Sequence, residues 1–462
     1  MNRNILFGAL LAAAVLPAWS QNGISQEMLA RYRQACTTTP TDKALNNAIA
    51  VNGLKSLATT AQNPAYDTHF SHEVKSKGIT NQQRSGRCWL FTGLNVLRAK
   101  VIARYNLGDF QFSQNYCFFY DQLEKSNLFL QGVIDNARKP MDDRLVEWLF
   151  KHPISDGGQF TGISDIISKY GLVPAEAMPE TFCSNNTTDY ARIVSTKLRE
   201  YGLRLRQMAA QGAKAKDLQA KKEEMLETIY RILVRCFGVP PQQFTWTMRD
   251  AKGKVISTKE YTPRSFYDET VGTDLKNGYV MFMNDPTRPF YKTFQIDMDR
   301  HAYDGENWTF VNVPAEELKQ MAIKSIQDST MMYLSCDVSK ELDSKKGFED
   351  AGNFLYGDLL GIDFPMDKKE RILTFASASS HAMTLMAVDL AADGKPLKWM
   401  VENSWGSDYG YKGHIIMTDQ WFDDYVFRLV VDKKYVPQKL LDLAKEKPTL
   451  LPAWDPLFAP EP

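Results

Sequence analysis

Residues 79–91 read Ile-Thr-Asn-Gln-Gln-Arg-Ser-Gly-Arg-Cys-Trp-Leu-Phe, and the interpretation of the whole chain starts from this stretch. Apolar residues follow Cys88 at the spacing of a helix that packs on a core: Leu90, Phe91, Leu94 and Leu97. A helix that begins at Cys88 points its unpaired N–H groups and its dipole at the sulfur, which favours a thiolate. Cys88 is therefore a candidate nucleophile. Taken alone, it could equally be a small buried hydrophobe, the usual fate of a free cysteine.

Two residues just before Cys88 suit the same chemistry. Gly86 has no Cβ and lets another part of the chain approach closely. Gln82 could donate its side-chain amide to a developing oxyanion, together with the backbone N–H of Cys88.

The second half of the chain contains the partners that such a cysteine needs. Ser379-Ser380-His381-Ala382-Met383 opens a predicted strand, and Val401-Glu402-Asn403-Ser404-Trp405-Gly406 closes the next one. A neutral His381 ring can take the proton of Cys88 and later protonate a leaving amine. Asn403 could accept the other ring N–H, and Trp405 would shield that bond from water. A lone histidine is more often structural and Asn-Ser-Trp-Gly could be a turn, but three such segments in this order favour a catalytic site.

Composition excludes several other classes of protein. The 462 residues are 44% hydrophobic and 24% charged, which is ordinary globular usage and excludes disordered, collagen-like and coiled-coil chains. The charges balance at 55 basic and 55 acidic residues, so nothing indicates nucleic acid as the main partner. The sequence contains no Cys-x-x-Cys or His-Glu-x-x-His pattern, and we expect no metal or cofactor. A disulfide among the five cysteines other than Cys88 stays open.

The first twenty residues have the pattern of a cleaved export signal. Arg3 precedes an apolar run from Ile5 to Pro17, and Ala18-Trp19-Ser20 offers small residues where a signal peptidase cuts. The run is too short for a stable membrane anchor. We therefore expect a periplasmic or secreted protein without membrane attachment. The alternative is a buried N-terminal helix.

The order of the patterns predicts an α+β fold with a helical half before a sheet half. We expect a signal peptide at 1–20, an N-terminal arm at 21–75, a helical lobe with the nucleophile at 76–190, an insertion at 191–312 and a β-rich lobe at 313–462. The insertion should contain two helices that break near Gly212, with its lysines on a solvated face. Gly171 should end an earlier helix, and the strands of the sheet half are predicted at 331–336, 382–388, 398–402, 414–417 and 427–431.

These motifs together resemble the papain-like cysteine peptidases and, within them, the bleomycin hydrolase and aminopeptidase C family. His381 follows Cys88 at far more than the roughly 130–150 residues of the general papain pattern. The stretch Asn-Gln-x-x-Ser-Gly-Arg-Cys-Trp-Leu-Phe nevertheless matches this branch. Further matches are Asp156-Gly157-Gly158-Gln159, Asn284-Asp285-Pro286, Cys336-Asp337-Val338 and the tail segment Leu451-Pro452-Ala453-Trp454-Asp455-Pro456.

The resemblance implies a papain-like two-lobed fold, a helical lobe plus an antiparallel sheet or barrel lobe, with a helical and hook insertion. It implies Cys88 as nucleophile, His381 as base and then acid, Asn403 as orienting group and Gln82 as oxyanion donor. Gly157 and Gly158 would pair with the substrate backbone, although an ordinary turn is the alternative for the glycine pair, and Trp405 would also contribute to substrate binding. The family's hook implies a ring-shaped homohexamer with its sites facing an inner chamber.

The resemblance also implies an aminopeptidase of broad specificity that acts on short peptides with free amino termini through a thioester. In the family the end of the chain lies in the cleft. The residue types at the end of this chain differ from those of the family. Glu461 or the Pro462 carboxylate is the candidate anion that binds the substrate ammonium. One alternative is an endopeptidase whose altered tail leaves the cleft open. Another is a ring-forming nucleic-acid-binding scaffold with secondary peptidase activity, which the balanced net charge disfavours.

Overall fold

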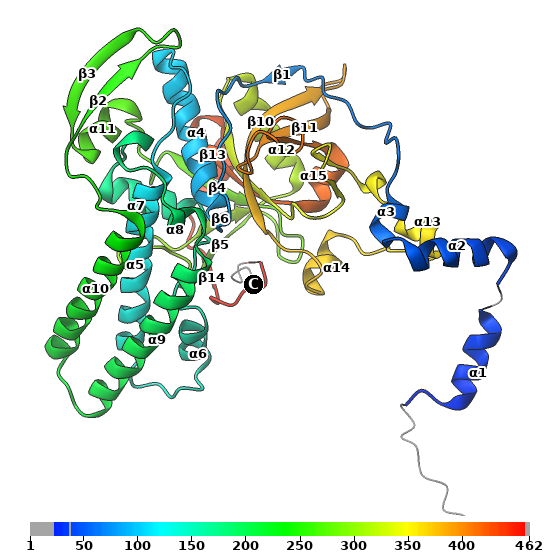
Figure 1. Cartoon of the computed structure of the whole chain (residues 1–462), viewed down its shortest axis with the longest axis horizontal. Helices are drawn as coiled ribbons and strands as arrows, with labels where there is room; N and C mark the ends of the chain where they lie inside the picture. The colour runs from blue at the N-terminus through cyan, green and yellow to red at the C-terminus, as the bar shows by residue number, and fades with distance from the viewer. Residues whose placement is uncertain (1–22, 37, 458–462) are drawn as a thin grey trace, which may run out of the picture. The chain divides into compact units, whose positions relative to one another are not determined.

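The computed structural model describes residues 23–36 and 38–457, so the predicted signal segment 1–20 and the tail residues Glu461 and Pro462 lie outside the described residues (Figure 1). The chain divides into two compact units. The smaller unit comprises residues 1–59 and 356–361, and the larger one comprises residues 60–355 and 362–462. The predicted N-terminal arm, 21–75, is therefore split between the units after Thr59.

The smaller unit is helical in its described residues. Its helices are α1 (Gln26–Ala35), α2 (Pro40–Val51), α3 (Leu54–Ala58) and α13 (Tyr356–Leu360). Thr39 caps α2, because its side chain accepts from the Asp42 N–H while the Asp42 carboxylate accepts from the Thr39 N–H. Helix α3 packs against α13, so two segments far apart in the sequence share this unit.

The helices of the larger unit form one group around α5, made of α4, α6, α7, α9 and α10, while others, such as α12 and α15, pack on the sheet (Figure 1). The helices of this unit are α4 (Cys88–Tyr105), α5 (Gln114–Asp135), α6 (Arg144–Lys151), α7 (Phe160–Tyr170), α8 (Phe182–Asn185), α9 (Thr188–Ala210), α10 (Ala215–Phe237), α11 (Pro263–Thr270), α12 (Ala315–Gln327), α14 (Lys368–Leu373), α15 (Asp419–Tyr425) and α16 (Gln438–Leu443), with short 3-10 turns at Ala175–Ala177, Ala351–Asn353 and Lys433–Tyr435. The predicted break near Gly212 is confirmed, and so is the end of α7 at Gly171. Within the described ranges, no helix combines the length and the apolar character needed to cross a membrane.

The strands of the larger unit form one large sheet and one separate hairpin. They are β1 (His72–Glu73), β2 (Phe244–Arg249), β3 (Val255–Tyr261), β4 (Tyr279–Met283), β5 (Lys292–Ile296), β6 (Thr309–Asn312), β7 (Met332–Cys336), β8 (Leu342–Asp343), β9 (Phe348–Glu349), β10 (His381–Leu390), β11 (Pro396–Glu402), β12 (His414–Thr418), β13 (Val426–Asp432) and β14 (Thr449–Leu451). The sheet order is β14-β5-β6-β4-β13-β7-β10-β11-β12-β9-β8, with β1 on β10, and most pairs are antiparallel. Strands β2 and β3 form the hairpin. The α+β class is confirmed.

The sheet begins earlier in the chain than the predicted β-rich lobe, 313–462. Strands β4, β5 and β6 fall in the range expected as insertion, yet β4 pairs with β13 and continues the sheet. The large sheet thus extends across the predicted boundary at 312. These strands are short and separated by turns, so their place in the sheet depends on pairing with distant strands rather than on any local pattern.

Helix α4 lies between the helices and the sheet, in contact with α5 and α7 on one side and with β7 and β10 on the other (Figure 1). The sequence predicts a single apolar stripe, but nearly every side chain from Cys88 to Ile102 is buried. A helix covered on all faces belongs to the core. Cys88 is therefore the first residue of a helix that belongs to the core.

Candidate active site

Cys88 is the first residue of α4, as predicted, and it is only 9% exposed. Arg87 stands at the N-cap, and no side chain caps the helix there. The N–H groups of the first turn are thus not consumed by a capping side chain, and the positive end of the helix dipole faces the sulfur. This environment favours the thiolate form of Cys88.

His381, Asn403 and Trp405 form one stacked and hydrogen-bonded group. His381 Nε2 lies 2.8 Å from Asn403 Oδ1, and because an amide oxygen only accepts, the ring donates from Nε2. This bond leaves Nδ1 of the neutral ring as the proton acceptor. Trp405 stacks on the imidazole with ring centroids 4.6 Å apart and planes inclined by 30°. The indole covers the ring as the sequence predicts.

Burial sets the charge preference of His381. The loss of hydration lowers its pKa to about 4, and the hydrogen bond with Asn403 opposes this shift without cancelling it. At neutral pH the isolated ring is therefore neutral. A neutral imidazole is the form that can accept a proton from a thiol.

Strands β7 and β10 lie against the helix that carries Cys88. Thr384, near the start of β10, donates its hydroxyl to the carbonyl oxygen of Thr92, one turn into α4, at 3.4 Å. Cys336 is the register partner of His381 in the β7–β10 ladder. Burial raises the pKa of the Cys336 thiol well above its usual value, with smaller contributions from nearby acids and from Cys88. Cys336 thus stays protonated beside the ionisable sulfur.

Gln82 reaches the site through a short antiparallel pairing with the segment after β11. The Gln82 N–H donates to the Ser404 carbonyl oxygen at 2.8 Å, and Gly406 N–H donates to Thr80 O at 3.1 Å. The Ser404 hydroxyl donates to Gln82 Oε1 at 2.7 Å, which fixes the orientation of the amide. Gln82 Nε2 donates one hydrogen to Ser85 O at 2.6 Å. Because an amide nitrogen carries two hydrogens, Gln82 Nε2 has a second one to donate to another acceptor.

The loop after α6 is tied to the beginning of α4. Gly86 N–H donates to Asp156 Oδ2 at 2.6 Å, and Trp89 Nε1 donates to the Asp156 carbonyl oxygen at 2.9 Å. A Cβ added to Gly86 would lie 2.5 Å from Asp156 Oδ1. The expected close approach at Gly86 is therefore made by this carboxylate.

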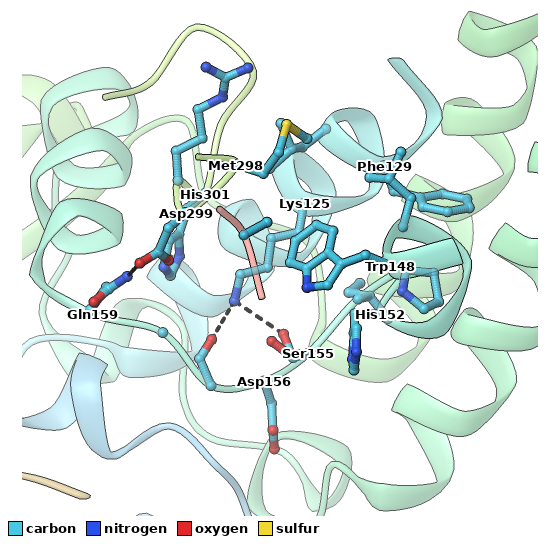
Figure 2. Close-up of a pocket in the computed structure, with 18 of the residues that line it drawn as sticks. Lys125, Phe129, Trp148, His152, Ser155, Asp156, Gln159, Met298, Asp299 and His301 are labelled. Atoms are coloured by element: carbon cyan, nitrogen blue, oxygen red, sulfur yellow. Dashed lines mark hydrogen bonds between the residues drawn. The ribbon is translucent and has the colours of Figure 1, made fainter. Parts of the chain in front are cut away.

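Gly157 and Gly158 differ in what surrounds them. A Cβ on Gly157 would meet nothing within 4 Å, whereas one on Gly158 would lie 2.2 Å from His301 Cε1. Both residues line a cavity of about 340 Å³ together with Gly86, Ser379 and Leu457 (Figure 2). Gly157 thus leaves room on the cavity wall, and packing alone requires a glycine at 158.

Behind this wall lies a buried charged cluster that sequence reasoning missed. His301 Nδ1 lies 2.5 Å from Asp121 Oδ1, and Lys125 pairs with Asp121 at 3.0 Å. Lys125 also donates to the carbonyl oxygens of Ser155 and Gly157 at 3.1 and 2.6 Å (Figure 2). The cluster fixes the backbone of the glycine loop. Its only local signal is the Asp121–Lys125 spacing on one helix face, because His301 comes from a distant segment.

A second set of contacts joins the glycine loop to the end of the described chain. Gln159 Nε2 donates to Asp299, whose pKa is raised to about 6 by burial (Figure 2). Arg428 donates from Nη1 to Gln159 Oε1 at 3.1 Å and from Nη2 to the carbonyl oxygen of Leu457. Leu457, the last described residue, therefore lies on the wall of this cavity.

The structure therefore brings Gln82, His381, Asn403 and Trp405 together at strands that pack on the helix beginning with Cys88, and it places the two glycines on a cavity wall. Glu461 and Pro462 lie outside the described residues. Among those that are described, no three His, Cys, Asp or Glu side chains are arranged to hold a metal ion.

Comparison with known proteins covers nearly the whole chain. The sequence model of the Peptidase C1-like family matches residues 23–458. Aminopeptidase C of Lactobacillus delbrueckii subsp. lactis is 37% identical over 89% of this chain and 93% of its own length. Bleomycin hydrolase of Homo sapiens is 35% identical over 95% of this chain and 99% of its own. The crystal structure of PepW from Lactobacillus rhamnosis HN001 superposes with a TM-score of 0.92 at 37% identity, covering 95% of this chain and 99% of that one.

Proposed function

Because the chain belongs to the Peptidase C1-like family, we propose that it is a cysteine aminopeptidase that removes N-terminal residues from short peptides through a thioester. The observation that carries this proposal is the His381–Asn403 bond of 2.8 Å beneath Trp405, next to the helix that begins at Cys88. An oriented neutral base beside a helix N-terminus suits the generation of a thiolate.

In the acylation step the Cys88 thiol transfers its proton to His381, and the sulfur attacks the carbonyl carbon of the first peptide bond. The carbonyl oxygen becomes an oxyanion that accepts from the Cys88 backbone N–H and from Gln82 Nε2. His381 then protonates the leaving nitrogen, and the C–N bond breaks. The shortened peptide leaves and the first residue stays on the sulfur as a thioester.

In the deacylation step water replaces the leaving peptide. His381 takes a proton from the water while the water oxygen attacks the thioester carbon. The Cys88 backbone N–H and Gln82 Nε2 then stabilise the second oxyanion, as they did the first. The C–S bond breaks, the amino acid leaves, and the sulfur regains the proton or remains paired with the imidazolium. Asn403 holds the ring in one orientation through both steps.

The limit to N-terminal residues is assigned to the chain end. We place the anion of Glu461 or of the Pro462 carboxylate opposite the substrate ammonium, where it would block longer occupancy upstream. Support comes from Leu457, which lines the cavity beside Gly157 and is held by Arg428. Deletion of residues 459–462 should convert aminopeptidase into endopeptidase action, and an unchanged product pattern would contradict this assignment.

Export and assembly are parts of the same proposal. The pattern of residues 1–20 supports cleavage near Ser20 and release into a periplasm or the outside. Resemblance to the bleomycin hydrolase family supports a homohexamer. Amino-terminal sequencing of the protein from its source and sedimentation of the purified chain test these two points.

The central test compares a free peptide with its N-acetylated copy, digested by the wild type and by Cys88→Ala. We expect stepwise loss of N-terminal residues from the free peptide alone, and no cleavage by the variant. Internal cleavage of both peptides would indicate an endopeptidase with an open cleft. Peptide cleavage by the Cys88→Ala variant would show that Cys88 is not the nucleophile.

A further inference from the structure

Two thiols that the catalytic mechanism does not use lie in contact with each other. Cys183 belongs to α8 and Cys236 to the last turn of α10, two helices that pack against each other, and the Cys236 thiol is hydrogen-bonded with that of Cys183. Both residues are partly exposed, whereas Cys117 and Cys336 are fully buried. This pair is therefore accessible to a small oxidant, and the two buried thiols are not.

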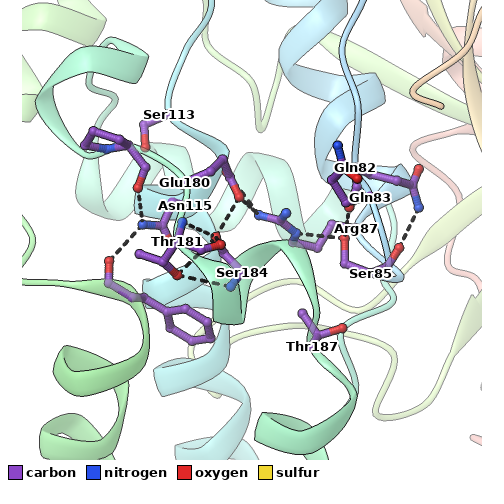
Figure 3. A network of polar contacts seen from close by, with 12 residues as sticks. Gln82, Gln83, Ser85, Arg87, Ser113, Asn115, Glu180, Thr181, Ser184 and Thr187 are labelled. Carbon is purple, nitrogen blue, oxygen red and sulfur yellow. Dashed lines mark hydrogen bonds and ion pairs between the residues drawn. The ribbon is translucent and has the colours of Figure 1, made fainter. Parts of the chain in front are cut away.

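The surrounding backbone holds the two cysteines in place. Thr181 donates its hydroxyl to the carbonyl oxygen of Cys236 itself, at 2.8 Å. Asn115 Nδ2 donates to Pro179 O at 2.7 Å and to Phe237 O at 2.8 Å (Figure 3). Two side chains thus bridge the segments that flank the sulfurs. The fold therefore holds the two segments next to each other, so a bond between the sulfurs would join neighbouring segments.

We propose that Cys183 and Cys236 form a disulfide bond in an oxidising compartment. Thiol–disulfide exchange with a low-molecular-weight disulfide, or with the disulfide of an oxidoreductase, supplies the oxidising equivalents. One protein sulfur gives up its proton and attacks the donor disulfide, whose S–S bond breaks and releases one thiol. The second protein sulfur then gives up its proton, displaces the other donor sulfur and closes the protein disulfide. Two protein thiols are oxidised, and one donor disulfide is reduced to two thiols.

Burial and the neighbouring Cys183 raise the pKa of the Cys236 thiol to about 11, so Cys236 is protonated at neutral pH in the reduced protein.

The bond would lie close to the contacts that support the nucleophile. Glu180 pairs with Arg87 Nη1 at 2.9 Å, and Ser184 donates to Glu180 Oε2 at 2.7 Å (Figure 3). The Arg87 guanidinium is buried directly before Cys88, so Glu180 is the acid that compensates its charge. A disulfide from Cys183 to α10 would anchor the short segment that carries this acid. The bond itself does not depend on peptidase activity, and its setting in the cell rests on the proposed export.

Peptide mapping after controlled oxidation tests the proposal. The full chain with Cys88→Ala is reduced, equilibrated with a mixture of oxidised and reduced glutathione, acid-quenched, alkylated and digested for mass spectrometry. We expect a linked pair of peptides that contains Cys183 and Cys236 and lacks two hydrogens. The link should be absent in Cys183→Ser and retained in the control Cys36→Ser. Two alkylated thiols, two separate glutathione adducts or a link to another cysteine would overturn the proposal.

Thermal unfolding gives a second readout that needs no turnover. The oxidised Cys88→Ala chain should melt several degrees above its reduced form, because the bond closes a long loop of the unfolded chain. The difference should vanish in Cys183→Ser, and a difference that persists there would contradict the assignment. Since neither readout uses a substrate, failure here leaves the proposed peptidase activity untouched.

Discussion

Arg98 donates from Nη2 to Glu402 Oε1 across 2.6 Å, and both side chains are almost completely buried. Arg98 lies on α4, the helix that begins with Cys88, and Glu402 directly precedes Asn403. The pair thus joins the helix of the nucleophile to the strand that ends directly before the orienting amide.

Removing one charge of this pair should destabilise the protein strongly. In Glu402→Gln the Arg98 guanidinium stays buried without its countercharge, and we expect a loss of about 3 kcal/mol in the free energy of unfolding by urea. Glu147→Gln is the control, since Glu147 and Lys151 form an exposed pair on one helix, and a much smaller loss is expected there. Equal losses in the two variants would contradict the role of burial.

Shortening Gln82 should slow the chemical step. In Gln82→Asn the amide is withdrawn by one carbon from the oxyanion, and we expect kcat to fall by about 10²-fold. Gln83→Asn is a matched control, because Gln83 is the next residue and is exposed, and asparagine tolerates its positive φ of 55°. Steady-state kinetics on one peptide amide checks both. A fall in kcat of similar size for Gln83→Asn would show that the loop, rather than the donor, was disturbed.

Uncovering the imidazole should move the acid limb of the pH profile. Trp405→Ala removes the ring that stacks on His381 and admits water, so the pKa of His381 should rise from about 4 toward its ordinary 6.5. We expect the acid limb of the kcat/KM profile to shift to higher pH by at least one unit. Measurement from about pH 3.5 to about pH 8 covers both pKa values of His381. An unshifted limb in a variant that is still active would mean that the indole does not control hydration of the ring.

His381 should also make stability depend on pH. Its folded pKa lies below its unfolded one, so between pH 6.5 and 4 the unfolded chain binds a proton that the folded chain does not. In Cys88→Ala, where no thiolate can pair with the ring, the free energy of unfolding should fall by about 3 kcal/mol as the pH decreases through this window. Denaturant unfolding at several pH values measures the slope. The slope should decrease when His381→Gln is added, and an identical slope would count against a buried neutral ring.

Lys368, the first residue of α14, anchors this helix to the sheet through hydrogen bonds. Its Nζ donates to Asn284 Oδ1, Asp423 O and Val426 O at 2.7, 3.0 and 2.6 Å. Lys368→Met leaves these buried acceptors without a donor and should cost about 3 kcal/mol of unfolding free energy. The exposed neighbour offers the control Lys369→Met, for which we expect a change within about 0.5 kcal/mol. Comparable midpoints for the two variants in urea would refute the prediction.

The features predictable from the sequence are those whose physical cause is local. The helix from Cys88 follows from its apolar spacing, and the end of α7 at Gly171 follows from a residue that tolerates positive φ. The strands that carry His381 and Asn403 likewise show their own apolar runs. Such signals lie within a few residues of the feature that they cause.

The tertiary structure decided everything that requires two distant segments to meet. The pairing of Gln82 with Ser404, the Arg98–Glu402 pair and the contact of Cys183 with Cys236 each join such segments. A hydrogen bond or ion pair acts over about 3 Å in space and leaves no periodicity in the chain. The reactive residues can therefore be identified from the sequence alone. Which of them can reach one another is decided only by the packing of α4 against the sheet.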